Sequence, residues 1–132
     1  MDGATAGAGR HDGFTADCRA RIAFEVLANR WDSVVVFTLG ESGPLRPRDL
    51  AARIGGISRK VLTEALRRLE YNGLVERTAY RQAPPRVEYG LTAPGRGLLG
   101  PMREMGAWAV AYGDDVVAAQ ERFAPRGRGP GE

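Results

Sequence analysis

Two short helix patterns separated by two glycines limit the folds that this sequence can adopt. Residues 47–54 carry an apolar stripe at helical spacing, and residues 55–57 (GGI) then form a tight turn. Ser58 is a good N-cap for a second helix, which runs to about Tyr71 and ends at residues 72–73 (NG). A short helix, a glycine turn and a second helix are typical of a helix-turn-helix motif.

The pattern changes to short strands after the second helix. Leu74 to Tyr80 is predicted to be one strand and Arg86 to Leu91 another, with a proline-containing loop between them. The second strand alternates apolar and charged residues, which is typical of a strand with one covered face. A basic β-hairpin directly after the second helix of a helix-turn-helix is a wing. The sequence therefore predicts a winged helix-turn-helix fold, mainly α with a small β-hairpin.

Two further helices are predicted before this motif. The first ends at Asn29, a residue type that suits the left-handed position after a helix. The second begins near Trp31 and runs to Glu41 through a nearly all-apolar segment, so it is expected to lie in the core. The alternative is a buried strand at residues 34–37, since β-branched side chains favour strands.

Length and composition indicate one globular domain. The 132 residues are enough for one core, and a hydrophobic content of 43% is typical of a globular chain. Residues 1–13 and 124–132 are rich in glycine with alanine or proline and are expected to be disordered. This leaves residues 14–123 for the winged helix-turn-helix domain with its dimerisation helices. The sequence shows no signal peptide or membrane helix, so a cytoplasmic protein is expected, nucleoid-associated when bound to DNA.

Residues suited to catalysis or metal binding are few. A single cysteine, Cys18, and a single histidine, His11, cannot form a multi-cysteine zinc site. The sequence contains no P-loop, no dinucleotide-binding glycine motif and no zinc-protease motif. We therefore expect no enzyme activity, no catalytic residue, no cofactor and no metal. The remaining classes are a DNA-binding regulator and a winged-helix module for protein–protein contact.

Basic residues are concentrated in one part of the chain. Between Leu45 and Arg86, ten Lys and Arg accompany four Asp and Glu, so this window carries +6 and the rest of the chain −3. A basic block in an otherwise acidic chain is typical of a polyanion-binding surface, and the alternative is an arginine-rich solvated surface. A protein–protein module predicts a neutral recognition face, so the charge favours the DNA-binding regulator.

The second helix of the motif is predicted to read DNA. On a helical wheel of residues 58–71 the apolar side chains face the core, and the opposite arc presents Lys60, Thr63 and Arg67. Lys and Arg donate hydrogen bonds to guanine, Thr contacts several bases, and the first residues of a helix favour a phosphate. Basic residues before the motif and in the wing are expected to contact the DNA backbone or minor groove. The predicted DNA contacts are Arg46, Arg48, Ser58, Arg59, Lys60, Thr63, Arg67, Arg77, Tyr80, Arg81 and Arg86.

Residues 57–99, ISRKVLTEALRRLEYNGLVERTAYRQAPPRVEYGLTAPGRGLL, closely resemble the HxlR-type winged helix-turn-helix regulators of bacteria. The most specific part is the wing motif PPRVEY at 84–89 with the LTAPG that follows it. The similarity extends from Cys18, just before the first helix, through the NRW corner at 29–31 to Trp108 in the last helix. It implies a homodimer that binds a roughly palindromic operator as a repressor or activator, with residues 58–71 as the recognition helix and 77–86 as the wing.

Two positions depart from the family pattern. Where members usually have a Phe-x-Glu-Leu-like stretch at the start of the first motif helix, this chain has LRPRDL at 45–50, with an additional proline. The proline is expected to shift the start of that helix. Gly90 replaces the small polar residue usual in the second wing strand and is expected to loosen the hairpin.

A long final helix is predicted to begin at Thr92 and to bend at Pro101. Two copies of its apolar stripe can pack as a coiled-coil-like pair, so the N- and C-terminal helices are expected to form a dimer interface. The alternative is packing of the stripe on the first helix of the same chain. The stripe consists of Leu98, Met102, Met105, Ala109, Tyr112 and Val116.

Two sets of residues are candidate sensors. Cys18 lies at the start of the first helix, where backbone N–H groups and the helix dipole stabilise a thiolate. The family resemblance also implies this role, since several members sense electrophiles through a cysteine at this place; the alternative is an inert packing residue. Four aromatic residues are candidates for a small-molecule effector pocket near the dimer interface, with core packing as the alternative. They are Phe24, Trp31, Trp108 and Tyr112.

Overall fold

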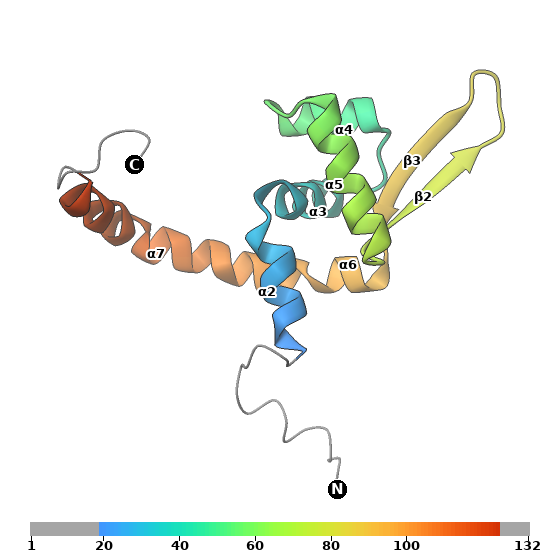
Figure 1. The fold of residues 1–132 in the computed structure, drawn as a ribbon. Helices are drawn as coiled ribbons and strands as arrows, with labels where there is room; N and C mark the ends of the chain where they lie inside the picture. The colour runs from blue at the N-terminus through green and yellow to red at the C-terminus, as the bar shows by residue number, and fades with distance from the viewer. Residues whose placement is uncertain (1–18, 125–132) are drawn as a thin grey trace, which may run out of the picture. The chain divides into compact units, whose positions relative to one another are not determined.

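The computed structural model describes residues 19–124 (Figure 1). The described residues fall into two units, one that ends at Arg96 and one that begins at Gly97. No helix of this part of the chain is long and apolar enough to cross a membrane. The elements are α2 (Ala20–Ala28), α3 (Arg30–Ser42), α4 (Pro47–Ile54), α5 (Arg59–Tyr71), β2 (Val75–Tyr80), β3 (Arg86–Leu91), α6 (Ala93–Gly97) and α7 (Leu99–Phe123).

Helix α3 forms the centre of the core of the first unit. Its side chains Val35, Val36 and Leu39 are buried, and α4 and α5 both pack against it. The apolar segment is therefore a core helix, and the strand alternative at residues 34–37 is wrong. In Figure 1 these helices lie together and the β2–β3 hairpin extends away from them.

The corner between α2 and α3 differs from the prediction. Asn29 has an extended backbone (φ −86°, ψ 111°) rather than a left-handed one. Its Oδ1 accepts hydrogen bonds from the N–H groups of Trp31 (3.2 Å) and Asp32 (3.3 Å). Asn29 is thus the N-cap of α3, a position that requires extended dihedral angles. The conformation of Asn29 is therefore that of a residue that begins α3 and not that of a residue that ends α2.

The α4–turn–α5 segment matches the predicted helix-turn-helix. Helix α4 begins at Pro47, where the missing N–H group costs nothing, so the additional proline fits the first helical position. Gly55 and Gly56 turn the chain with φ of 74° and 70°. The Oγ of Ser58 accepts a hydrogen bond from Val61 N–H at 3.1 Å and caps α5. The buried residues of α5 are Leu62, Ala65, Leu66 and Leu69.

The hairpin is well formed despite Gly90. Strands β2 and β3 pair antiparallel through six residue pairs. Leu45 adds two backbone hydrogen bonds to Tyr89, with N–O distances of 3.0 and 2.8 Å, which tie the segment before α4 to β3. A Cβ at Gly90 would lie 3.2 Å from Cγ of Pro44. The small residue therefore lets the chain before α4 approach β3 closely.

Thr92 joins the end of the hairpin to the end of α5. Its Oγ1 donates a hydrogen bond to the carbonyl of Gly73 at 2.6 Å and accepts one from Gly95 N–H at 3.2 Å. Its own N–H donates to the carbonyl of Leu74 at 3.1 Å. These bonds hold the first turn of α6 against the start of β2, and Gly95 is buried there.

The predicted final helix is interrupted. The helical segment stops at Gly97 and resumes at Leu99, with Leu98 between them, so there are two helices and not one bent at Pro101. Pro101 has no N–H group to donate to the carbonyl of Gly97. Because α7 begins at Leu99, Pro101 lies in its first turn, where an N–H group would have no partner within the helix.

We expect Gly95→Ala to lower the free energy of unfolding by about 1–3 kcal/mol, because a Cβ at this position collides with the carbonyl oxygen of Leu74. Gly97→Ala is the matched control, since a Cβ there meets no atom within 4 Å. Urea denaturation of the two variants and the wild type measures the difference. Equal stability of both variants would contradict this account of the α6–β2 junction.

Candidate nucleic-acid interface

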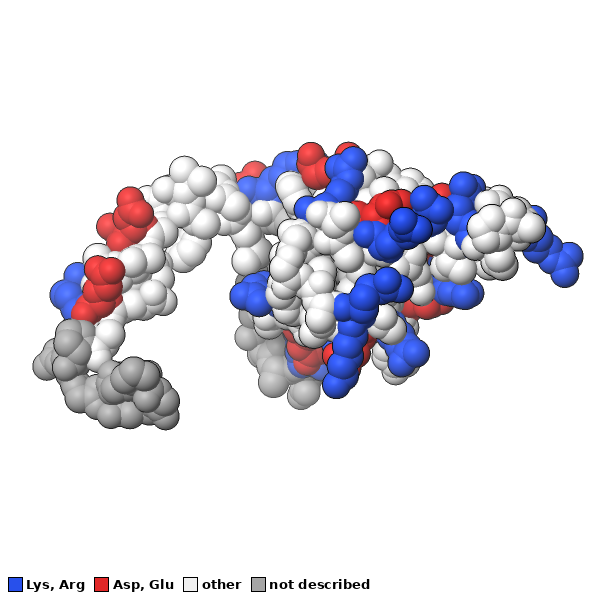
Figure 2. Space-filling model, turned by 90° about the horizontal axis from the view of Figure 1, so that it is seen from above, with Lys and Arg blue, Asp and Glu red and all other residues white. Residues whose placement is uncertain are grey.

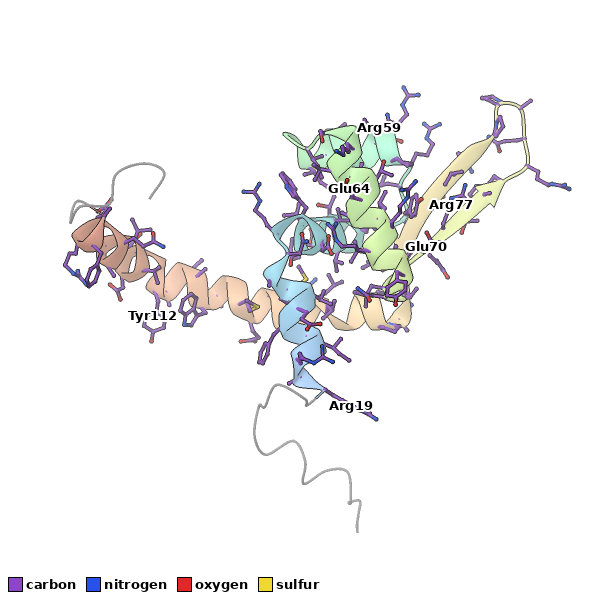
Figure 3. All side chains as sticks on the ribbon, in the orientation of Figure 1. Arg19, Arg59, Glu64, Glu70, Arg77 and Tyr112 are labelled. Atoms are coloured by element: carbon purple, nitrogen blue, oxygen red, sulfur yellow. The ribbon has the colours of Figure 1, made fainter. Side chains whose placement is uncertain are left out.

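Helix α5 presents the predicted recognition arc to solvent. Lys60, Thr63 and Arg67 are exposed, whereas the opposite side of the helix is buried against the core. Within residues 19–124, none of these three side chains takes part in a hydrogen bond or ion pair. Figure 3 labels Arg59 and Glu64, which lie along α5 beside this arc. The arc thus carries donors that are not used inside the fold.

Exposed basic side chains also lie on α4 and on the hairpin. Figure 2 shows them over the helices and along the hairpin, with acidic side chains between them. Arg48 is exposed, and Arg46 is exposed with an ion pair to Asp49 at 3.3 Å. Arg53 is also exposed on α4 and was not among the predicted contacts. The sequence signal that could have identified Arg53 is its position in the basic window between Leu45 and Arg86.

The predicted wing contacts lie on different faces of the hairpin. Paired residues of an antiparallel ladder share a face, and faces alternate along each strand. Tyr80 pairs with Arg86 on one face, and Arg77 pairs with Tyr89 on the other. Arg81 follows β2 in the loop. The structure therefore brings Tyr80 and Arg86 together and separates both from Arg77.

Arg86 is engaged within the hairpin. Its guanidinium carbon lies 4.6 Å from the ring centroid of Tyr80, and its Nε lies 3.4 Å from Oε2 of Glu88. Arg81, by contrast, is exposed and has no ion pair among the described residues. Arg81 and Arg77 are thus both available on the surface of the wing, while Arg86 supports the shape of the wing.

The candidate sensors remain predictions. Cys18 lies outside the described residues. Phe24 and Trp31 belong to the first unit, and Trp108 and Tyr112 to the second. Within each unit, Arg30 stacks over Trp31 at 4.4 Å, and the rings of Trp108 and Tyr112 are 6.0 Å apart.

The described part of the chain offers no evident metal site. In residues 19–124, no group of three or more His, Cys, Asp or Glu comes together where it could hold an ion. A cavity of about 870 Å³ lies beside α2 and the C-terminal end of α5, and none of the four predicted aromatic residues lines it.

The profile of the HxlR-like helix-turn-helix family matches residues 26–117. The chain belongs to this family. The HTH-type transcriptional regulator YodB of Bacillus subtilis is 36% identical over 102 residues, which cover 76% of this chain and 90% of YodB. This HxlR-type chain is thus related to transcriptional regulators.

Solved structures show the same fold. The reduced form of B. subtilis YodB matches with a TM-score of 0.64 and 38% identity, covering 70% of this chain and 90% of that one. The redox regulator HypR in its oxidised form matches with a TM-score of 0.62 and 32% identity, covering 71% and 96%. The predicted winged helix-turn-helix fold and HxlR-type resemblance are therefore confirmed.

We expect Ser58→Ala to destabilise the protein by about 0.5–2 kcal/mol, because the N–H of Val61 loses its acceptor at the start of α5. Ser58→Asp retains an N-cap acceptor and is expected to keep nearly all of the stability. Thermal and urea unfolding of both variants test this pair. Full stability of the alanine variant would show that the cap contributes nothing.

Proposed function

We propose that this HxlR-type regulator binds double-stranded operator DNA as a homodimer and reads its sequence with α5. The observation that carries this proposal is the exposed arc of Lys60, Thr63 and Arg67, whose donors have no partner within residues 19–124. These side chains match the chemistry of base edges in the major groove. The alternative, a protein–protein module, offers no reason for such a basic arc.

In this proposal the parts of the motif have different tasks. Arg67 and Lys60 donate to the O6 and N7 atoms of guanine. The N-terminus of α5, with Ser58 and Arg59, lies against a phosphate, where backbone N–H groups and the helix dipole favour negative charge. Arg81 contacts phosphates or the minor groove from the wing. Backbone contacts fix the register, and base contacts give the specificity.

The proposed dimer rests on α7. No residue of this 25-residue helix is buried, and it exposes Met105, Trp108, Tyr112 and Val116. An apolar helix surface of this extent is typical of a protein interface. A two-fold dimer would place its recognition helices about 34–36 Å apart, one turn of DNA, on a palindromic site. Sedimentation at micromolar concentration tests the dimer, and a monomer both on and off DNA would contradict it.

We further propose that oxidants or electrophiles regulate DNA binding through Cys18. The related YodB has been solved in reduced, diamide-treated and quinone-bound forms, and HypR in an oxidised form. In this chain Cys18 is the single cysteine, so oxidation would yield a sulfenic acid, a mixed disulfide or a disulfide between subunits.

We expect Arg67→Ala or Lys60→Ala to weaken operator binding by about 1–3 kcal/mol and to relax preference at the contacted base pair. Binding to operator and scrambled duplexes, measured by fluorescence anisotropy, gives both quantities. The scrambled duplex is the control, because loss of one positive charge alone would weaken binding to both duplexes alike. Wild-type affinity of a folded Arg67→Ala protein would contradict the assigned role of α5.

Arg81→Ala in the wing is expected to weaken binding to all sequences alike. Loss of one phosphate contact should also flatten the slope of log K against log salt by about one unit. A salt titration with operator and scrambled DNA measures this slope. A selective loss of operator affinity would instead assign Arg81 to base recognition.

For Cys18, we expect peroxide or quinone to lower the operator affinity of the wild type and to leave Cys18→Ser unaffected. A thiolate-absorbance titration should give a pKa below the free value of about 8.5, because the sequence places Cys18 just before the first predicted helix and a helix N-terminus stabilises a thiolate. An ordinary pKa together with oxidant-insensitive binding would make Cys18 a packing residue.

A further inference from the structure

Asp32 is a charged residue in an otherwise apolar core. It lies in the first turn of α3, and only 4% of its surface is exposed. Removal of a carboxylate from water is costly unless it is paired and hydrogen-bonded. The pattern of the sequence assigns no role to Asp32 or to its partner, Arg68 of α5.

Arg68 binds both oxygens of this carboxylate. Its Nη2 donates to Oδ1 at 2.7 Å, and its Nε lies 3.2 Å from Oδ1 and 3.1 Å from Oδ2. The hydrogen bond to Asp32 and the charges of Asp32 and Glu64 raise the pKa of Arg68 above its ordinary value, against an opposing effect of burial. A planar guanidinium held at two points has a defined direction as well as a strong attraction.

This pair constrains α5 in a way that its apolar packing does not. Hydrophobic contact is non-directional, so the leucine side of α5 alone allows small rotations about the helix axis. Arg68 adjoins Arg67 in the sequence, and its side chain joins α5 to the first turn of α3. Rotation of α5 would stretch these bonds and at the same time swing the recognition arc.

We propose that Asp32 is a positioning residue for DNA recognition: through Arg68 it fixes the rotation of α5, and with it the direction in which Lys60 and Arg67 extend. This inference rests on the proposed DNA-binding function. Base recognition requires side chains held to about 0.5 Å, whereas phosphate contacts tolerate more movement. The pair therefore supports discrimination between sequences more than affinity for DNA in general.

The test is the double variant Asp32→Ala/Arg68→Ala, which leaves the net charge of the protein unchanged. The full-length protein is titrated with a duplex that the wild type selects from random-sequence DNA and with a scrambled duplex, at one salt concentration. We expect affinity for the selected duplex to fall about tenfold or more, a loss within the range of base-specific contacts. Affinity for the scrambled duplex should change less than about twofold, since phosphate contacts are retained.

Gly95→Ala is the control for a purely structural role, because it is expected to lower stability while the Asp32–Arg68 pair stays intact. Its ratio of selected to scrambled affinity should equal that of the wild type when both proteins are folded. If the double variant does not fold, Arg68→Lys replaces it in the test. Lysine keeps the charge but not the two-point geometry, so the ratio of selected to scrambled affinity should again fall.

The outcomes separate the two proposals. A wild type that selects no sequence would overturn the proposed function. A wild type that selects a sequence, with an unchanged ratio in a folded double variant or in Arg68→Lys, would overturn the positioning role alone. A fall in the ratio for Gly95→Ala equal to that of the double variant would also overturn it, because lost stability would then suffice.

Discussion

Helix α5 buries Leu62, Ala65, Leu66 and Leu69 in the core around α3, and this contact decides which of its residues face the solvent. Burial of these side chains stabilises the first unit by the hydrophobic effect. The same contact leaves the opposite arc, with Lys60 and Arg67, on the surface. Stability of the fold and availability of the recognition arc are therefore two results of one packing arrangement.

Polar contacts add direction to this arrangement. Asn29 caps α3, so the first turn of α3 is well defined and holds Asp32 against Arg68. Asp32 is buried, whereas the side chain of Arg68 is 43% exposed. Such a pair is weak evidence for net stability, because the gain in attraction competes with the loss of hydration. Its two-point geometry is what distinguishes it from the leucine contacts. An orientation of α5 is thus specified by a pair whose net stabilisation is modest.

The wing depends on contacts at its base and on contacts within it. The hydrogen bonds of Thr92 attach α6 to the end of α5 and the start of β2, and Leu45 attaches the segment before α4 to β3. Near the loop, the stacking of Arg86 on Tyr80 ties the two strands together. The wing is thus fixed to the same core that orients α5, and Arg81 extends from a supported hairpin.

The order and bounds of the motif follow from the sequence alone, because the signals for them are local. The glycine turn, the Ser58 cap and the alternation of β3 act within a few residues. The pairing of Asp32 with Arg68, which are 36 residues apart, depends on the packing of α3 against α5. The contacts of Arg86 with Tyr80 and Glu88 likewise depend on how the hairpin folds. From composition alone, Arg68 and Arg86 would both be assigned to the basic surface. Whether a guanidinium meets a carboxylate, a ring or solvent depends on how distant segments pack, and helical or strand periodicity carries no information about that.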